Sequence, residues 1–380
     1  MNYQICNSCV MDTSHHPEIS FNVFGVCSFC QSFEQYQESY LNKIDKPSEF
    51  NKAIQLMKEE GIGKPYDCLL GLSGGVDSSY LAIKLKELGL RVLLVQLDNG
   101  WNTELSTYNI QLIAEKCNFD LITYIVDWEE FRDIQKSFLL ASVRNLEAPS
   151  DHAIFATIYN TAIKYKIKYL ISGVNYQTEF TSSSSYGHAY SDLKQIKGIH
   201  NLYGSKKIKT FPVLNYWKRL YYDLFTSKIQ YVTLLNYMDY NKEDAIQELI
   251  KNIGWKPYEG KHFESTITIF HQAYYLPTKF KLDKRRLHLS DLIRTGFITR
   301  DMALIEMGKP ILEQEKLNEL IHYVAKKFEL SEKELIQIVG KPEVHYSFYP
   351  NFDFQVKVTK NFLTFLARFR KIVTLNGKFK

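Results

Sequence analysis

The segment of this 380-residue chain best suited to bind an anion is a heptapeptide of small and polar residues, Ser73-Gly74-Gly75-Val76-Asp77-Ser78-Ser79. The glycines let the backbone approach a ligand closely, and the free N–H groups at a helix start favour negative charge. The serine hydroxyls add hydrogen-bond donors. No Gly-Lys-Ser/Thr follows the glycines, so the loop is not a Walker A motif. The spacing therefore predicts a phosphate site of a different kind.

This loop joins a predicted strand to a predicted helix. The apolar run Cys68–Leu72 is typical of a buried parallel strand, and residues 80–88 have apolar side chains at helical spacing. In this setting the heptapeptide resembles the PP-loop, SGGxDS, of the ATP pyrophosphatases. Those enzymes cleave ATP between the α- and β-phosphates, adenylate a carbonyl oxygen and let a nitrogen or sulfur nucleophile displace AMP. The alternative interpretation is a Ser/Gly turn that caps a helix.

The resemblance implies ATP and Mg²⁺ as cofactors of the loop. The nucleotide-binding residues that it implies are Ser73, Gly74, Gly75, Asp77, Ser78 and Ser79. Asp77 is expected to meet Mg²⁺ or to order the loop, because carboxylate oxygens suit this hard cation.

The elements around the loop alternate between strand and helix. Strands are expected near residues 69–70, 91–97, 121–126 and 169–172, and helices over 76–88, 103–117, 129–143 and 151–166. Such alternation predicts an α/β fold, a doubly wound parallel sheet with helices on both faces. Ligands of such folds bind at the carboxyl ends of the strands. Asp98 and Gly173 follow two of these strands, so we expect both near the nucleotide, with Asp98 meeting adenosine.

Four cysteines form the second motif with chemical potential. Cys6 and Cys9 make one C-x₂-C pair and Cys27 and Cys30 another. This spacing is typical of a zinc ribbon, in which four thiolates close a tetrahedral Zn²⁺ site with a structural role. An iron–sulfur cluster is the minor alternative, and four reduced cysteines without metal are the other. The remaining two cysteines, Cys68 and Cys117, are expected in the core.

Composition narrows the possible classes of protein. The chain has a net charge of +5, 45% hydrophobic and 23% charged residues, and six cysteines. The net charge is too small to indicate nucleic-acid binding by itself, and the cysteine content is too low for a disulfide scaffold. The sequence contains no run of about 18 apolar residues and no secretory signal. We therefore expect a cytoplasmic protein without a membrane span.

The chain divides into three predicted parts: a zinc ribbon over 1–40, a nucleotide-binding domain over 41–215 and a mostly helical domain over 216–380. Helices in the last part are expected near residues 216–236, 241–253, 262–276, 288–294, 299–307, 310–328 and 331–339. Residues 181–187 are a Ser-rich stretch, either a flexible loop or a lid over nucleotide. Residues 362–371 are amphipathic and basic, and we expect a docked helix there in preference to a membrane contact.

The whole set of motifs resembles a narrower family. The cysteine ribbon, the loop, the strand end Ile171-Ser172-Gly173-Val174-Asn175 and the run YYLPTKFKLDKRRLHLS over 274–290 resemble the N-acetyl sugar amidotransferases of bacterial surface-polysaccharide and nonulosonic-acid pathways. These enzymes are similar to the synthetase domain of asparagine synthetase. The resemblance implies conversion of an acetamido group on a nucleotide-linked sugar into an acetamidino group. ATP·Mg²⁺ would adenylate the amide oxygen, ammonia would attack, and AMP and pyrophosphate would be released, in lipopolysaccharide or O-antigen biosynthesis.

The resemblance also implies a partner that supplies ammonia. That partner is expected to be a separate glutaminase, similar to the histidine-pathway glutaminase with its barrel partner. The chain fits this division because neither Cys68 nor Cys117 has the Gly-x-Cys-x-Gly context of a nucleophile elbow.

The chemistry needs a cation on the leaving pyrophosphate and a group that handles protons or orients ammonia. Lys284 and Arg285 are the predicted cations, ahead of Lys279 and Arg286, and a solvated basic helix face is the alternative. Glu179 occupies a place similar to the acidic residue after the glycine turn of asparagine synthetases and is, with Asp77, a predicted catalytic residue; the alternative for Glu179 is an ordinary loop carboxylate. The other candidates are His262, Glu264 and His288, and Asp151 either caps a helix or points into the cleft.

Two other functions compete with this interpretation. One is a PP-loop tRNA-modifying enzyme, such as a thiolating enzyme, in which the zinc ribbon binds RNA. The small net positive charge of the chain argues against this function. The other is a non-catalytic nucleotide-binding scaffold whose ribbon recruits a glutaminase, which the intact loop disfavours.

Overall fold

The computed structural model describes residues 3–14, 19–181, 188–189, 191–222, 229–260, 263–359 and 361. Most of the Ser-rich stretch, His262 and the predicted helix over 362–371 lie outside these residues. No helix within the described ranges has the length and apolar character needed to cross a bilayer.

A five-stranded sheet with strand order β3-β2-β1-β4-β5 lies at the centre of the chain, and all its pairings are parallel. The strands are β1 (Cys68–Gly71), β2 (Val92–Asp98), β3 (Asp120–Ile125), β4 (Tyr169–Ile171) and β5 (Gln230–Val232). The first β-strand is central, with Leu69 opposite Leu93 on one side and Leu170 on the other. Strands β2 and β3 are added on one side of β1, and β4 and β5 on the other. The point between β1 and β4 is therefore a topological switch point, where open α/β sheets bind their ligands.

Helices cover both faces of this sheet, which confirms the predicted fold class. Leu70 and Leu94 face one layer and pack with residues of α2, α3, α4 and α10. Leu69 and Leu93 face the other and pack with α6. Alternate residues of the same strands thus enter different cores, as the period of two demands. These helices are α2 (Lys46–Glu60), α3 (Val76–Glu87), α4 (Glu104–Cys117), α6 (Ala148–Tyr165) and α10 (Lys242–Ile253).

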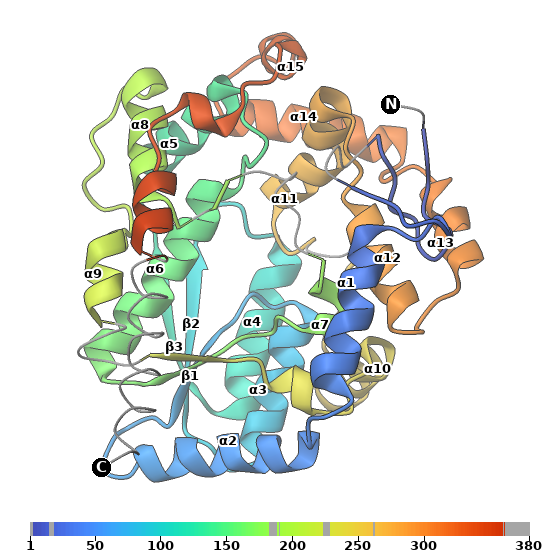
Figure 1. Ribbon diagram of the computed structural model, residues 1–380. Coiled ribbons are helices and arrows are strands. Elements are labelled where there is room, and N and C mark those ends of the chain that lie inside the picture. The colour runs from blue at the N-terminus through green and yellow to red at the C-terminus, as the bar shows by residue number, and fades with distance from the viewer. Residues whose placement is uncertain are drawn as a thin grey trace, which may run out of the picture.

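A third, larger core lies beyond the carboxyl ends of the strands and is built mainly by later helices. In Figure 1, α11, α14 and α15 lie above the sheet, on the side to which β2 points. The remaining elements are α1 (Ser28–Tyr36), η1 (Gln37–Leu41), α5 (Trp128–Ala141), α7 (Tyr176–Glu179), α8 (Leu193–Tyr203), α9 (Tyr216–Tyr221), η4 (Leu234–Tyr237), α11 (Thr266–Phe270), η5 (His271–Phe280), α12 (Arg285–Arg294), α13 (Arg300–Met307), α14 (Gln314–Lys327), α15 (Glu332–Gly340) and η6 (Tyr346–Phe348).

Two sequence expectations for residues 216–280 were wrong in detail. The predicted helix over 216–236 is instead the short helix α9 followed, after an undescribed stretch, by β5 and η4. Strand β5 forms because its backbone pairs with β4, with Tyr231 opposite Leu170, a long-range contact that local periodicity does not report. The predicted helix that ended at residue 276 continues as the π-helix η5, which contains Pro277.

The cysteine segment packs against the carboxyl-terminal half of the chain. Leu287 of α12 joins the cluster around the four cysteines, and Val10 packs with Leu289 and Ala303. Figure 1 shows this dark-blue segment beside the orange helices α12 and α13. Described residues of this segment are therefore held by contacts with residues more than 250 positions further along the chain. The division of the chain into three domains stays a prediction.

Candidate active site

The loop after β1 folds into a compact turn at the carboxyl end of this central strand. Gly74 has φ +80°, a backbone conformation that favours glycine. Ser73 Oγ accepts a hydrogen bond from the Gly75 N–H at 3.2 Å and lies 3.3 Å from Ser78 Oγ. The Ser78 hydroxyl also donates to the Gly75 carbonyl. These contacts hold the turn at the start of α3 and leave it with the form expected of an anion site.

Aromatic residues from a distant segment fasten this loop from outside. Trp255 Nε1 and the Tyr258 hydroxyl both donate to the Gly74 carbonyl, each at 3.1 Å. Ser106 of α4 donates to the Ser73 carbonyl at 3.0 Å. The loop is thus held in one conformation before any ligand arrives, which reduces the ordering cost of binding.

A cleft of about 350 Å³ opens beside the loop. Its walls come from the ends of β1 and β2, from α6 and from the segment around α11 and the start of α12. The lining residues are Gly71, Leu72, Ser73, Val95, Gln96, Leu97, Asn99, Asn102, Ile110, Glu147, Ser150, Asp151, Ile154, Thr157, Ile158, Glu264, Ser265, Thr268 and Lys284. Residues from four separate parts of the chain therefore meet at the carboxyl edge of the sheet.

The strand ends that were expected to converge do so at β1 and β4. A Cβ placed on Gly173 would lie 3.1 Å from Asp77 Cβ, so these two backbones are in close contact. The Tyr240 hydroxyl donates a hydrogen bond to Asp77 Oδ1. Burial and the nearby Asp77 raise the pKa of Tyr240, and Glu179 acts in the same direction. Asp77, Gly173 and Glu179 thus belong to one neighbourhood beside the loop.

Two predicted nucleotide-binding residues face elsewhere. Asp98 Oδ1 accepts a hydrogen bond from the Gly100 N–H at 2.9 Å, and the side chain is not among those lining the cleft, where Asn99 and Gln96 stand instead. Ser79 is fully buried, and its hydroxyl has no hydrogen-bond partner in the described part of the chain. Their roles in binding ATP stay predictions.

Lys284 reaches the cleft and meets a buried acid there. Its Nζ lies 3.8 Å from Glu147 Oε2. The same carboxylate accepts from Thr268 and lies 2.7 Å from His271 Nδ1. Burial alone would raise the pKa of Glu147, but Lys284, His271 and the Thr268 hydrogen bond outweigh it and hold that pKa far below its usual range. Glu147 is therefore a fixed anion that anchors Lys284.

A second acid lies one helical turn further along α6. Asp151 faces the same cleft and, unlike Glu147, makes no side-chain hydrogen bond with any described residue that the structure records. The helix begins at Ala148 with Glu147 as its N-cap residue, so Asp151 lies within the helix and the expectation of a cap was wrong. Burial and the negative Glu147 raise the pKa of Asp151 to about 7, despite the opposing effect of Lys284.

Glu264 closes the cleft on the side of the loop. A Cβ on Gly75 would come within 2.1 Å of Glu264 Oε1, so this carboxylate lies directly against the loop backbone. It was one of three weaker sequence candidates. His288, another of them, contacts the Thr178 carbonyl at 3.4 Å and is absent from the cleft lining.

The other predicted cations serve as structural contacts. Arg285 binds Asp283 through Nε and Nη2 and donates through Nη1 to the carbonyls of Glu306 and Lys309. Its guanidinium is thereby occupied away from the cleft, which does not support a catalytic role. Lys279 donates to three carbonyls at the end of α15, and Arg286 holds the cysteine segment through Val10 and Asp12.

The four cysteines of the N-terminal segment meet at one point. Their sulfur atoms all lie within 4.8 Å of one another, and all four side chains are buried. Cys9 Sγ and Cys27 Sγ are 3.7 Å apart, close to the edge of a tetrahedron with zinc–sulfur bonds of about 2.3 Å. Backbone N–H groups of Ser8 and Cys27 point at Cys6 Sγ. The arrangement fits one ion held by four thiolates.

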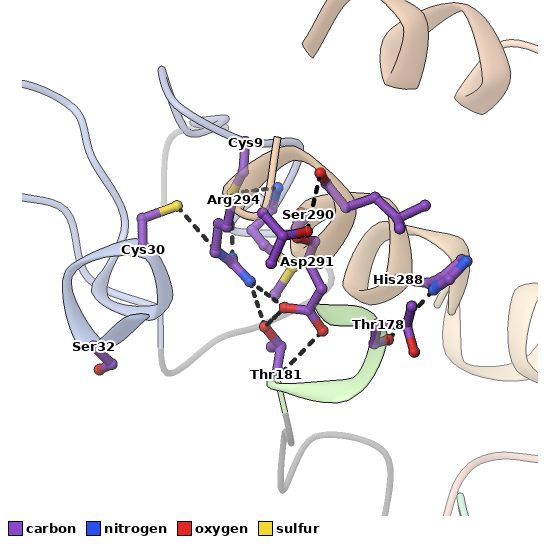
Figure 2. Close-up of polar contacts among 12 residues, drawn as sticks. Cys9, Cys30, Ser32, Thr178, Thr181, His288, Ser290, Asp291 and Arg294 are labelled. Carbon is purple, nitrogen blue, oxygen red and sulfur yellow. Dashed lines mark hydrogen bonds and ion pairs between the residues drawn. The ribbon is translucent and has the colours of Figure 1, made fainter. Parts of the chain in front are cut away.

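A buried arginine joins this cluster to the rest of the protein (Figure 2). Arg294 Nε donates to Cys30 Sγ at 3.2 Å and Nη2 to Cys9 Sγ at 3.5 Å. Its Nη1 contacts Asp291 at 2.7 Å and also Thr181. Four thiolates around one divalent ion would leave a net negative charge, and this guanidinium would partly neutralise it. The same residue ties the cluster to the segment after α7.

Comparison with known proteins gives one family match. Residues 264–362 match a family described as "LPS biosynthesis protein WbpG-like, C-terminal domain". The matched segment begins at Glu264 and includes Lys284, so it contributes one wall of the cleft. No curated protein matches the chain.

Two solved structures resemble the chain at low sequence identity. The NMN synthetase from Francisella tularensis is 14% identical with a TM-score of 0.34, over 76% of this chain and 98% of that chain. The NH3-dependent NAD synthetase from Campylobacter jejuni is 15% identical with a TM-score of 0.28, over 55% of this chain and 85% of that chain. At these TM-scores the likeness supports no argument about function.

Proposed function

We propose that this chain is an ATP-dependent amidotransferase of lipopolysaccharide or O-antigen biosynthesis. In this proposal it converts an acetamido group of a nucleotide-linked sugar into an acetamidino group, through an adenylated amide and ammonia, with release of AMP and pyrophosphate. The proposal joins the family resemblance of the sequence motifs to the match of residues 264–362 with a lipopolysaccharide-biosynthesis domain.

One observation carries the proposal: Lys284 of the matched segment and Ser73 of the anion-binding loop line the same cleft. The loop N–H groups and hydroxyls would bind phosphate oxygens, and Lys284 would stabilise the negative charge that develops on the departing pyrophosphate. Asp77, oriented by Tyr240, is the residue best placed in the loop to hold Mg²⁺. Mg²⁺ supplies charge neutralisation on the phosphates when it is bound.

The position of the cysteines disfavours a tRNA-thiolating enzyme. Cys68 and Cys117 are buried in the core beside the sheet, and the other four are gathered in the metal cluster. No cysteine therefore lines the cleft among the residues that the structure describes. A sulfur-transfer route through a cysteine of this chain would need one there.

We propose Zn²⁺ as the ion of the four-cysteine cluster, with a structural role. All four thiols are directed at one point, so a tetrahedral ion would keep no open position for substrate. Ammonia would come from a separate glutaminase of the histidine-pathway type, and the reaction would take place in the cytoplasm, where ATP and sugar nucleotides are available.

The test is incubation of the purified zinc-loaded protein with ATP, Mg²⁺, isotope-labelled ammonium and a panel of UDP- and CMP-linked acetamido and diacetamido sugars. The expected result is one equivalent each of AMP and pyrophosphate per labelled amidine formed, detected by mass spectrometry. Formation of ADP, or of AMP without an acetamido acceptor, would contradict the mechanism. Tight binding of bulk tRNA at moderate salt would instead favour the RNA-modifying alternative.

A further inference from the structure

We propose that Asp151 is the general base of the amination step, and this inference rests on the proposed function. Its carboxylate accepts a proton from the nitrogen of ammonia as that nitrogen bonds to the adenylated amide carbon. The C–O bond to AMP then breaks, and AMP leaves with the bonding electron pair. The product is an amidinium ion, so the step consumes one ammonia and transfers one proton to Asp151.

Elimination among the acids of the cleft leads to Asp151. The oxygens of Glu147 are already taken by Thr268 and His271, with Lys284 close by. Glu264 lies against the loop backbone, where the phosphates of ATP would pass. Asp77 is held by Tyr240, and neither Asp77 nor Glu179 is among the residues that line the cleft. Of the three acids that line it within the described part of the chain, Asp151 is the one with neither a recorded hydrogen bond nor a close contact with the loop backbone.

The surroundings of the two acids on α6 suit different tasks. Glu147 and Asp151 are four residues apart, so their side chains project from the same helix face. The raised pKa of Asp151, about 7, makes it an effective base near neutral pH, whereas the depressed pKa of Glu147 makes that residue a weak one. Two carboxyl groups with pKa values pushed apart are a recurring arrangement in acid–base sites.

The position of Asp151 also matches the path of the reaction. Lys284 contributes to its electrostatic environment from the start of α12, and Ser73 lines the same cleft from the loop. An acceptor amide that reaches the α-phosphate of ATP in this cleft would therefore meet Asp151 along the α6 wall. Ile154 and Ile158 continue that wall as apolar surface, which limits hydration of the base.

The decisive variant is Asp151→Asn, with the two half-reactions measured separately. Adenylation is followed as pyrophosphate released in the first turnover without ammonia, using the acceptor that gives most AMP with the wild type. Adenylation is expected to stay within about threefold of the wild type, whereas amidine formation should fall about 100-fold or more. Asp151→Glu should recover part of the loss, and Asp301→Asn on the exposed surface of α13 is the matched control.

The pH profile separates a base from a structural residue. Among the described residues, the charged groups that line the cleft with Asp151 are Glu147, Lys284 and Glu264, and the first two act on its pKa. With ammonia expressed as its unprotonated concentration, wild-type amination should fall about tenfold per pH unit below a pH of about 7 and level off above it. The Asp151→Asn profile should lack this limb.

The expected loss of amination in Asp151→Asn would not result from unfolding of the variant. Because the folded-state pKa of Asp151 is raised, its contribution to stability is complete at low pH and is lost as pH rises through about 7. Asp151→Asn should therefore have a Tm equal to or above that of the wild type at pH 8.

Three outcomes would overturn the inference: unchanged amination, equal loss of both half-reactions, or an unchanged pH limb in Asp151→Asn. A wild type that forms no AMP and pyrophosphate with any acceptor would instead refute the proposed function itself, and the half-reactions tell the two failures apart.

Discussion

The cysteine cluster and the cleft are both polar sites inside the protein, but they differ in how fully their charges are partnered. Around the cysteines, Arg294 contacts two sulfur atoms, Asp291 and Thr181, and Arg300 binds the carbonyls of Cys6 and Cys9. In the cleft, Asp151 has no recorded hydrogen bond from the described residues and lies near another acid.

This difference indicates two purposes. A buried network in which every member is satisfied rigidifies the structure, whereas an acid left unpartnered costs stability and is retained where chemistry needs it. The cluster therefore has the properties of a structural site that links two segments of the chain, and the cleft has those of a reaction site. Four variants test this contrast, from the largest expected effect to the smallest.

Removal of two of the four cluster cysteines should have the largest effect on folding. The double variant Cys9→Ser, Cys27→Ser is expected to lose its zinc and roughly 3 kcal/mol or more of unfolding free energy, because metal binding and folding are coupled. Metal analysis and denaturant unfolding measure the two quantities. Cys117→Ala, which changes a core cysteine outside the cluster, should keep the zinc. Retention of full stability by the double variant would show that the cluster does not stabilise the fold.

Lys284→Met should have the largest effect on activity. Loss of the cation from the cleft is expected to lower kcat/KM about 100-fold to 1000-fold, because charge on the leaving pyrophosphate would no longer be stabilised. Its neighbour provides the contrast. Arg285→Met should mainly lower the Tm, since Arg285 binds Asp283 and two helix-end carbonyls.

Steady-state kinetics and thermal unfolding of the two variants form one comparison. If folded Arg285→Met lost as much activity as Lys284→Met, the sequence-based prediction for Arg285 would be restored and the structural assignment would fail.

Arg294→Lys should lower the metal affinity of the cysteine cluster without abolishing metal binding. A lysine keeps the charge but cannot reach two sulfur atoms and Asp291 through one planar group. Zinc affinity, measured by competition with a chelator, is expected to fall about 10-fold to 100-fold. Arg132→Lys on α5, remote from the cluster, is the control. An affinity equal to wild type would mean that Arg294 contributes only to packing.

Gly74→Ala should have the smallest effect, and it tests the loop. Gly74 has φ +80°, and a Cβ there would lie 2.8 Å from the Ser106 carbonyl oxygen. The strain of a left-handed residue costs about 1–2 kcal/mol, and the contact adds to it. The KM for ATP should rise with the loss of stability. Gly63→Ala carries a similar φ of +76° with nothing within 4 Å, so it should show the strain without the change in KM.

Much of the fold could be predicted because its signals are local. Strands β1 to β4 and the helices between them lie within a few residues of their predicted positions, since apolar periodicity and Gly-rich ends mark them. Strand β5 could not be predicted, because three residues carry too little periodicity and their state depends on pairing with β4.

The site was predicted less completely. Lys284 and Arg285 are adjacent and both cationic at neutral pH, and only their partners, Glu147 and Asp283, separate the cleft residue from the structural one. Glu147 and His271 carried no signal in the sequence, because neither belongs to a motif and they meet across more than 120 residues. Asp151 was recognised only as a cap or a cleft residue.

The sequence by itself determined the anion-binding loop, the four-cysteine cluster and the order of strands and helices, because each depends on spacing within a short segment. Only the tertiary structure decided which basic residue enters the cleft, which acid is left unpartnered there and which arginine contacts the cysteine cluster. Those outcomes depend on contacts between distant segments, where burial and opposing charge set the state of each group.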